Sequence, residues 1–355
     1  GDLVQNGLIK NQWRKHFFTP LAPLMHRMSV YPVRGNHERG RYFFNRYFSL
    51  PRQTSTNPNY NYYFFDYSNV RFINLDTNVG HRKKRQLRWL KIALNEANSN
   101  NKIDFIIVQF HHPYKSEAWT WGNTEFSGEI ENILSKSTKV NNKPIIYFNG
   151  HTHAYSRGHK NDSRLTMITT GPIGGAIDYW SSKSRDYSEY HKTIAQYGWA
   201  MVKVTKDESP SIQILRYGFG DKYNLVDTGL IDQYQIKRYS TAPNQPSILE
   251  LQLHEEQQTL TVSRYKADEP HLSSQIKITY LNKRGKSQEE ILTFNKNNIF
   301  NGVENQQTAD LSRLPLKLRL KKGDRISLRV RYRNESLKWS PWSDKFPVFN
   351  EHGDD

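Results

Sequence analysis

The side chains that could perform chemistry lie in four short segments that are far apart along the chain. They are Gly1-Asp2, Gly35-Asn36-His37-Glu38, Phe110-His111-His112-Pro113 and Gly150-His151-Thr152-His153. Carboxylate oxygens, amide oxygens and imidazole nitrogens are the ligands of borderline metals such as Zn, Mn, Fe and Co. Each segment alone has a structural explanation, because Gly-Asp pairs form turns and a His-Pro pair often ends a strand. Together they predict a metal site.

Short apolar strands and amphipathic helices must position these segments, because such elements alternate over the first two thirds of the chain. Helices are predicted over 82–96, where Leu87, Leu90 and Leu94 share one face, and over 127–135. Buried strands are predicted over 30–33, 70–75, 104–110, 144–148 and 165–170. Three of the four segments follow such strands, which is the usual place for a site in an α/β sheet.

The sequence pattern changes near residue 240. Residues 240–246 contain two prolines and are predicted to be a linker after a first domain over 1–239. Apolar and polar residues then alternate, which predicts strands over 249–253, 260–264, 276–281, 316–320 and 326–332. Short strands separated by turns indicate a β-sandwich over 247–349, followed by a polar tail over 350–355.

The composition is that of a globular protein with a basic surface. The 355 residues include 51 Lys and Arg against 34 Asp and Glu, a net charge of +17. This charge suits anionic partners, and it equally serves a solvated surface. We expect no specific nucleic-acid binding, because the basic run over 81–85 opens an amphipathic helix. The absence of cysteine excludes thiolate sites, and no apolar run reaches the ~20 residues of a membrane span.

In their order, the four segments resemble the successive signatures of the calcineurin-like metallophosphoesterase superfamily. The run over 150–157 resembles the Gly-His-x-His-Ala-Tyr-x-Arg segment of purple acid phosphatases, and Gln86, Trp89 and Leu90 resemble that family's helix opening. The resemblance covers residues 1 to about 220. It implies a four-layer α/β/β/α sandwich that hydrolyses phosphate esters, with a hydroxide between two metal ions as the nucleophile.

The resemblance implies a role for each candidate residue on the metal side. Asp2 would bridge two divalent or mixed-valence ions, which we expect to be Fe, Zn or Mn. Asn36, His111 and His151 would complete one metal site, and His153 would bind the other ion. Gln5 stands where purple acid phosphatases carry a tyrosine, so an Fe(III) centre of the purple type is not expected.

On the substrate side, the resemblance implies that His37 contacts the phosphate or protonates the leaving oxygen. Tyr155 and Arg157 would lie at the rim of the site, where they touch substrate or hold the loop. Apart from the resemblance, the place of His112 after a presumed ligand is compatible with contact to substrate, with support of a ligand, or with a hydrogen-bonded histidine at a strand end. The substrate would be a phosphorylated small molecule or macromolecule, and the reaction that of an acid phosphatase-like phosphomonoesterase. A phosphodiesterase or nucleotidase is the alternative enzyme, and a binding protein with a remnant domain is the alternative of another class.

Two further expectations concern the ends of the catalytic domain. The family's opening Asp signature has no counterpart in the sequence, so we expect a domain without its first strand and first metal signature. Such a piece would bind one metal well and hydrolyse little. At the other end, Trp339-Ser340-Pro341-Trp342-Ser343 resembles the Trp-Ser-x-Trp-Ser element of fibronectin III-like modules. Arg329, Arg331 and Arg333 are expected to stack on its tryptophans, and the module favours a secreted or periplasmic protein.

Overall fold

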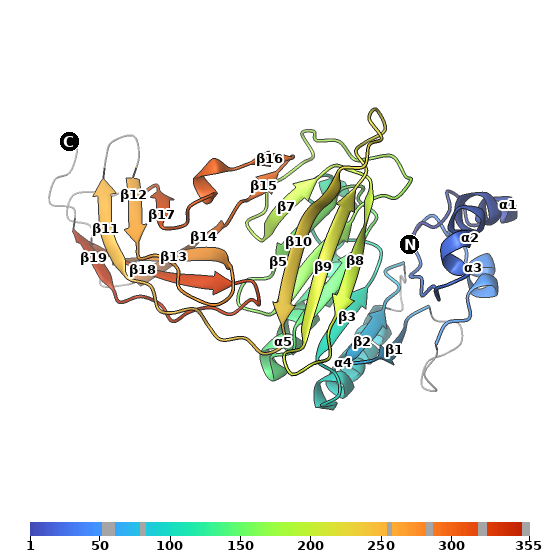
Figure 1. The fold of residues 1–355 in the computed structure, drawn as a ribbon, viewed down its shortest axis with the longest axis horizontal. Helices are drawn as coiled ribbons and strands as arrows, with labels where there is room; N and C mark the ends of the chain where they lie inside the picture. The colour runs from blue at the N-terminus through green and yellow to red at the C-terminus, as the bar shows by residue number, and fades with distance from the viewer. Residues whose placement is uncertain (52–60, 79–82, 254–257, 282–286, 319–324, 350–355) are drawn as a thin grey trace. The chain divides into compact units, whose positions relative to one another are not determined.

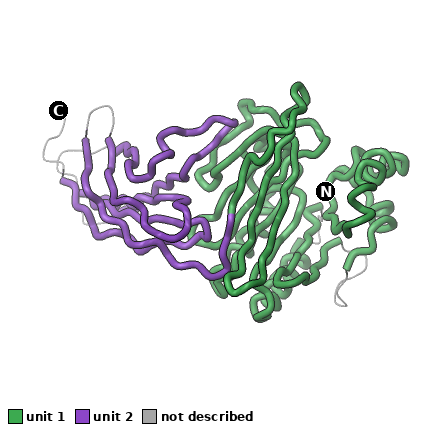
Figure 2. Tube along the Cα trace, in the orientation of Figure 1, with its two compact units in different colours: residues 1–234 green, residues 235–355 purple. Residues whose placement is uncertain are grey.

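The computed structural model describes residues 1–51, 61–78, 83–253, 258–281, 287–318 and 325–349. The chain divides into two compact units, residues 1–234 and 235–355 (Figure 2). The predicted limits, 1–239 and 247–349, stay predictions, and the predicted linker over 240–246 contains neither helix nor strand. The predicted tail over 350–355 and the first two residues of the basic run, 81 and 82, lie outside the described residues.

The first unit is built on a mixed sheet in the order β1-β2-β3-β4-β6-β5-β7 (Figure 1). The bounds are β1 Tyr63–Tyr67, β2 Val70–Asn74, β3 Phe105–Gln109, β4 Ile145–Asn149, β5 Tyr155–His159, β6 Leu165–Thr170 and β7 Tyr190–Ile194. The central strands β2, β3, β4 and β6 are parallel, whereas β5 pairs antiparallel with both β6 and β7. A second sheet has the order β10-β9-β8, from β8 Gly198–Val204, β9 Ser211–Gly218 and β10 Gly229–Lys237.

Helices α4 (Lys83–Ser99) and α5 (Glu125–Asn141) cover one face of the mixed sheet (Figure 1). Both bury apolar stripes in a single core, in which Trp89 and Leu90 of α4 and Ile130 of α5 meet Ile106 and Val108 of β3. Both predicted helices are confirmed, and each extends further than predicted. The four predicted strands from residue 70 onward are also confirmed.

A cluster of short helices precedes the sheet: α1 (Lys10–Gln12), the π-helix η1 (Trp13–Phe18), α2 (Thr19–Met25) and α3 (Tyr42–Tyr47). Buried aromatic rings hold it together, and Trp13 donates its indole N–H to the Gly7 carbonyl at 3.0 Å. This anchors the chain segment that carries Asp2. The strand predicted over 30–33 is wrong, because this segment is irregular. Pro32 has no N–H for a ladder, and its carbonyl instead accepts a hydrogen bond from the Tyr63 hydroxyl at 3.0 Å.

The second unit consists of antiparallel sheets in the orders β11-β12-β17 and β14-β13-β18-β19. The bounds are β11 Ile248–Leu253, β12 Gln258–Val262, β13 His271–Leu281, β14 Ser287–Asn295, β17 Arg313–Leu316, β18 Arg325–Asn334 and β19 Phe346–Phe349, with a small hairpin of β15 (Ile299–Phe300) and β16 (Val303–Glu304). Alternate residues of these strands form one apolar core. The predicted all-β unit is confirmed and is consistent with a fibronectin III-like module.

The strand predicted over 316–320 lies earlier in the sequence, because β17 ends at Leu316. After it, the Gln258 side chain takes over the pairing, donating to the Leu318 carbonyl at 3.0 Å and accepting from the Leu318 N–H at 2.5 Å. Residues 319 and 320 of the predicted strand lie outside the described residues. No helix in the described part of the chain has the length and apolar character to cross a membrane.

A ladder of cations and tryptophans covers β18 in the second unit. Arg331 lies between Trp339 and Trp342, with its guanidinium carbon 4.2 and 4.4 Å from the two ring centroids. Arg333 stacks on the outer face of Trp339 at 5.0 Å, and the Lys277 ammonium lies 5.1 Å from Trp342. The predicted stacking is therefore confirmed for two of the three arginines.

Arg329 departs from that prediction, because its Nε donates to the Ser343 carbonyl at 2.8 Å. The two serines of the Trp-Ser-Pro-Trp-Ser run attach it to β18. The hydroxyls of Ser340 and Ser343 accept the N–H groups of Tyr332 and Val330, both at 2.9 Å. The same serines return their own N–H groups to those residues' carbonyls. The run thus pairs with β18 partly through side chains.

Candidate metal centre

Three of the four ligand segments converge at the carboxyl end of β3. The Nε2 atom of His111 lies 3.0 Å from Oδ2 of Asp2 and 3.0 Å from Oδ1 of Asn36. The second carboxylate oxygen of Asp2 accepts the backbone N–H of His37 at 2.8 Å. Residues separated by up to 109 positions in the sequence therefore present a carboxylate, an amide oxygen and an imidazole to one another.

Glu38 holds the first two segments together. Its buried carboxylate accepts the backbone N–H groups of Asp2, Leu3 and Gly35 at 3.0, 2.6 and 2.5 Å. A Cβ on Gly35 would lie 2.1 Å from Oδ1 of Asp2, so only glycine permits this approach. No role was predicted for Glu38. The sequence places it three residues after Gly35, but it does not show that the Glu38 carboxylate accepts backbone N–H groups near the start of the chain.

The fourth segment joins through His151. The ring centroid of His151 lies 5.1 Å from that of His111 and 4.5 Å from that of His112. One ligand nitrogen from each of the three rings lies within 4.8 Å of the others. The backbone of His151 is left-handed, with φ +67°, as is that of Asp2, with φ +58°. Both residues hold this sparsely populated conformation at a place where the side chains must converge.

Burial sets the protonation of this cluster. It lowers the pKa of His111 to about 4 and that of His112 to about 3, and it also lowers the pKa of His151. These imidazoles are therefore neutral at pH 7, which is the form that binds metals. Burial would raise the pKa of Asp2, but its hydrogen bonds from His111 and the His37 N–H outweigh burial and hold that pKa below the usual range.

The donor set fits a borderline metal ion. It combines one carboxylate, one amide oxygen and neutral imidazoles, the ligands that Zn, Mn and Fe share in proteins. The Nε2 atom of His111 lies 3.0 Å from both Oδ2 of Asp2 and Oδ1 of Asn36, so these three groups could share one ion. The residues present therefore fit the metal that the resemblance implies.

His153 and His37 are oriented by backbone carbonyls. The backbone N–H of His153 donates to Asp178 Oδ2 at 2.7 Å, and its Nδ1–H donates to the carbonyl of Ala176. His37 donates Nδ1–H to the Gln5 carbonyl at 2.7 Å. Each ring thus keeps Nε2 for another partner. His37 lies beside Asp2. His153 is not part of the group that His111, His112 and His151 form.

Tyr155 and Arg157 do not lie at the rim of the site, so that prediction is wrong. Both are buried in β5, with exposed fractions of 0% and 5%. The Tyr155 hydroxyl donates to Asp232 Oδ2 at 2.6 Å, and Arg157 forms two bonds to the same carboxylate at 2.6 and 3.0 Å. Lys192 adds a third cationic contact at 2.9 Å. These residues hold β5 and β10 together.

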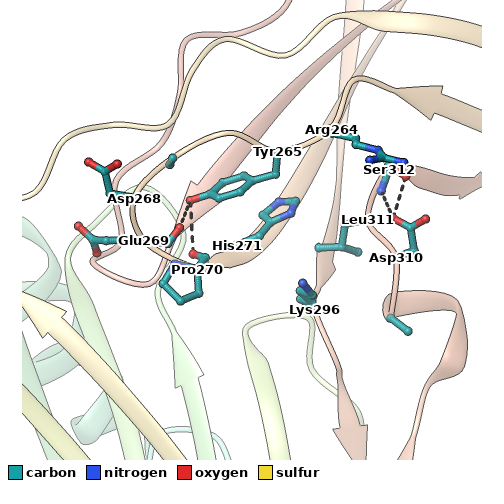
Figure 3. Close-up of a pocket in the computed structure, with 12 residues that line it drawn as sticks. Arg264, Tyr265, Asp268, Glu269, Pro270, His271, Lys296, Asp310, Leu311 and Ser312 are labelled. Atoms are coloured by element: carbon teal, nitrogen blue, oxygen red, sulfur yellow. Dashed lines mark hydrogen bonds between the residues drawn. The ribbon is translucent and has the colours of Figure 1, made fainter.

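The second unit carries a separate open groove of about 710 Å³ (Figure 3). Its wall includes Tyr265, which stacks on His271 with ring centroids 4.3 Å apart, and the cationic side chains of Arg264 and Lys296. Asp310 in the wall is engaged by the Ser312 N–H and hydroxyl. The groove contains none of the predicted site residues.

Comparison with known proteins gives a family for the first part of the chain. Residues 1–155 match the model of the calcineurin-like phosphoesterase family. No curated protein matches the sequence. Among solved structures, the chain is similar to the Plasmodium protein GAP50, described as the anchor in the inner membrane complex, at 18% identity and a TM-score of 0.37. It is also similar to the yellow lupin purple acid phosphatase PPD1, at 18% identity and a TM-score of 0.45.

These similarities are partial in length. The match to GAP50 covers 50% of this chain and 55% of that chain, and the match to PPD1 covers 57% and 37%. The family model, in contrast, spans all four segments up to His153, and its match agrees with the mixed α/β sheet that brings three of them together. Residues 1–155, a little less than half of the chain, match the model of the calcineurin-like phosphoesterase family.

Proposed function

We propose that the chain hydrolyses phosphate esters with two bound metal ions, as an acid phosphatase-like phosphomonoesterase. The family match supports phosphoester hydrolysis in general. The observation that carries the proposal is the meeting of Asp2, Asn36 and His111 at 3.0 Å, with His151 beside them. The net charge of +17 is favourable for anionic substrates.

The residues present would divide the metal sites as follows. Asp2, Asn36, His111 and His151 would hold one ion, and Asp2 with His153 would contribute to the other. Fe, Zn or Mn in divalent or mixed-valence states suit these donors. When bound, such ions supply Lewis-acid polarisation of the phosphoryl group and activation of water.

The chain's own residues then position substrate and move a proton. His37 donates Nδ1–H to Gln5, which orients the ring and leaves Nε2 for a phosphoryl oxygen or the leaving oxygen. Glu38 holds the backbone N–H groups of Asp2 and Leu3, and the His37 N–H donates to Oδ1 of Asp2. Together these bonds orient the Asp2 carboxylate toward His111. The substrate would be a phosphorylated small molecule or macromolecule. We also propose an extracytoplasmic location, because modules like the second unit usually occur there.

The test measures metal and turnover on the same preparations. His111→Ala is compared with wild type and with His26→Ala, a control at an exposed histidine of the first unit. Wild type and the control should bind metal, and their release of nitrophenol from p-nitrophenyl phosphate, even if slow, should require that metal. His111→Ala should lose both. Equal metal content and equal turnover in all three proteins would refute the proposal.

Parallel assays with bis-p-nitrophenyl phosphate and a nucleoside monophosphate separate the alternative enzymes. Preference for the monoester supports the phosphatase, and preference for the diester or nucleotide supports the other reactions. Metal binding without turnover of any ester would favour the binding protein. His37→Ala adds a second check, since it should reduce turnover more than metal content.

A further inference from the structure

His112 is the histidine of the cluster that the proposed function does not use on the metal side. Its ring centroid lies 4.5 Å from that of His151, closer than His111 lies to His151 at 5.1 Å. The rings of His111 and His112 are 4.8 Å apart and nearly perpendicular, at 83°. In each of the three rings, one ligand nitrogen lies within 4.8 Å of the other two. His112 therefore takes part in the cluster as closely as its neighbours do.

This arrangement depends on where β3 ends. Successive side chains of an extended strand point to opposite faces, so adjacent histidines in a strand would diverge. However, β3 ends at Gln109, and the chain bends at residues 111 and 112. The bend turns both imidazoles toward His151. A purely structural histidine at this position would not require that convergence.

Thr77 holds the His112 ring from behind. Its Oγ1 lies 2.7 Å from Nδ1 of His112 and accepts the backbone N–H of His112 at 3.2 Å. In the tautomer that donates Nδ1–H to the threonine oxygen, Nε2 is the atom left for a metal. Histidines that bind metals are commonly fixed in this way, with the second ring nitrogen bonded to an oxygen.

The turn that carries Thr77 is itself rigid. The neighbouring Asp76 is buried and accepts two bonds from the Arg34 guanidinium, at 3.2 and 3.3 Å. Its backbone N–H donates to Gln86 of α4 at 2.8 Å. These bonds hold the turn in place, and Thr77 in turn orients the His112 ring.

We propose that His112 is a metal ligand and forms a three-imidazole site with His111 and His151. The proposal rests on the proposed function only in placing a metal at these two shared histidines. Imidazole nitrogens suit a borderline divalent ion such as Zn²⁺ or Co²⁺, and His112 would join the ligands already assigned to this ion. The proposal replaces the substrate-side role considered for His112 from the sequence.

The test uses Co²⁺ alone as the probe on the full chain, with the d–d absorption bands as the readout. Loss of an oxygen that orients a ligating histidine typically costs roughly 10–100-fold in metal affinity. Thr77→Val should weaken Co²⁺ binding within that range, and His112→Ala should weaken it further and change the band intensities. His26→Ala should bind as wild type does. Far-UV circular dichroism without metal confirms that each variant is folded.

The outcomes separate this proposal from the proposed function. If His112→Ala binds Co²⁺ like wild type while His111→Ala does not, the metal-ligand role of His112 is refuted and the proposed function stands. If neither variant loses Co²⁺, both are refuted. Should His112→Ala fail to fold, ¹⁵N-histidine spectra of the wild type during Zn²⁺ titration decide. A shifted His112 Nε2 resonance supports the proposal, and an unmoved one contradicts it.

Discussion

Two carboxylates of the first unit are held in opposite ways. The Asp232 side chain, 2% exposed, contacts the cations of Arg157 and Lys192 at 2.6 and 2.9 Å. The Asp2 side chain is 16% exposed, and its closest side-chain partner is the neutral imidazole of His111 at 3.0 Å. Both carboxyls keep a pKa below the usual range, although burial opposes it at each. Protein cations balance the charge of Asp232, whereas we propose that a bound metal ion balances the charge of Asp2.

The largest expected effect is on stability at the balanced site. Asp232→Ala would leave Arg157 and Lys192 without their carboxylate, and breaking a buried pair on one side typically costs about 3–5 kcal/mol. We expect the free energy of unfolding in urea to fall by that amount, with metal binding retained. Asp227→Ala, at an exposed aspartate close by, should cost less than about 1 kcal/mol. A loss as small in Asp232→Ala would contradict the contrast between the two carboxylates.

The next largest effect is expected at Asp2, where a substitution should change metal affinity more than stability. Asp2→Ala should lower metal affinity by about 100-fold, roughly 2.7 kcal/mol, because the bridging carboxylate is lost. Without metal, the free energy of unfolding of Asp2→Ala should lie within about 1 kcal/mol of the wild-type value, because the substitution leaves no buried Arg or Lys without its carboxylate. Metal content after gel filtration, measured beside urea unfolding, checks both halves. Full metal occupancy in Asp2→Ala would show that Asp2 is not needed for metal binding and would contradict the contrast between the two carboxylates.

Cations stacked on tryptophan rings provide a third case in the second unit. Arg331 stacks between Trp339 and Trp342 and also donates to Gln275 Oε1 at 2.8 and 2.6 Å. Arg331→Ala should reduce the stability of this unit by about 2 kcal/mol, through loss of two cation–π contacts. Lys277→Ala, which removes one cation–π contact at the end of the ladder and an ion pair at 3.2 Å with the exposed Glu289, should cost less than half as much. Thermal unfolding followed by tryptophan fluorescence measures both, and equal losses would refute the ladder's central role for Arg331.

Glu117 is a buried carboxyl whose charge is opposed rather than balanced. Burial raises its pKa to about 8, helped by the negative charges of Asp186 and Glu189, although Thr193 and the Tyr187 N–H donate to it. The folded protein thus keeps a proton that the unfolded chain releases above its ordinary pKa of 4.5. Stability should therefore fall as pH rises from about 4.5 to 8, by up to about 1.4 kcal/mol per pH unit.

Glu117→Gln should flatten that dependence, because the amide does not ionise. Urea unfolding at pH 6 and pH 7 measures the slope in both proteins. A slope unchanged by the substitution would assign the pH dependence to other groups and remove Glu117 from this comparison.

Patterns within single elements made much of the fold predictable. Apolar runs located β2, β3, β4 and β6, and the spacing of Leu87, Leu90 and Leu94 located α4. The exception at 30–33 was an apolar run as well, but Pro32 cannot donate to a ladder. The stacking of Arg331 and Arg333 followed from strand alternation. Alternation could not show that Lys277, from the neighbouring strand β13, takes the place expected of Arg329.

The residues that meet in the candidate site were predictable from short motifs and from the family that those motifs resemble. Asp2, Asn36, His111 and His151 lie close together as expected, and their roles as ligands stay a prediction. The motifs misplaced Tyr155 because the position follows a ligand turn, while the partner that buries it, Asp232, lies 77 residues later. Interactions of this kind depend on which strands become neighbours, and the local sequence does not contain that information.

The order of strands in the mixed sheet has a consequence for how the protein folds. The turn with His151 and His153 joins β4 to β5, yet these strands are not neighbours, because β6 lies between them. Within the described part of the chain, β5 pairs with β6 and β7, both later in the chain, whereas β4 pairs with the earlier strand β3. During synthesis, the β4 end of this turn can therefore pair first, and the β5 end gains its ladder only after residues 165–170 have emerged and paired with β4. His151 would then reach His111 and His112 before His153 is fixed, so His153 would be the last of these histidines to reach its folded position.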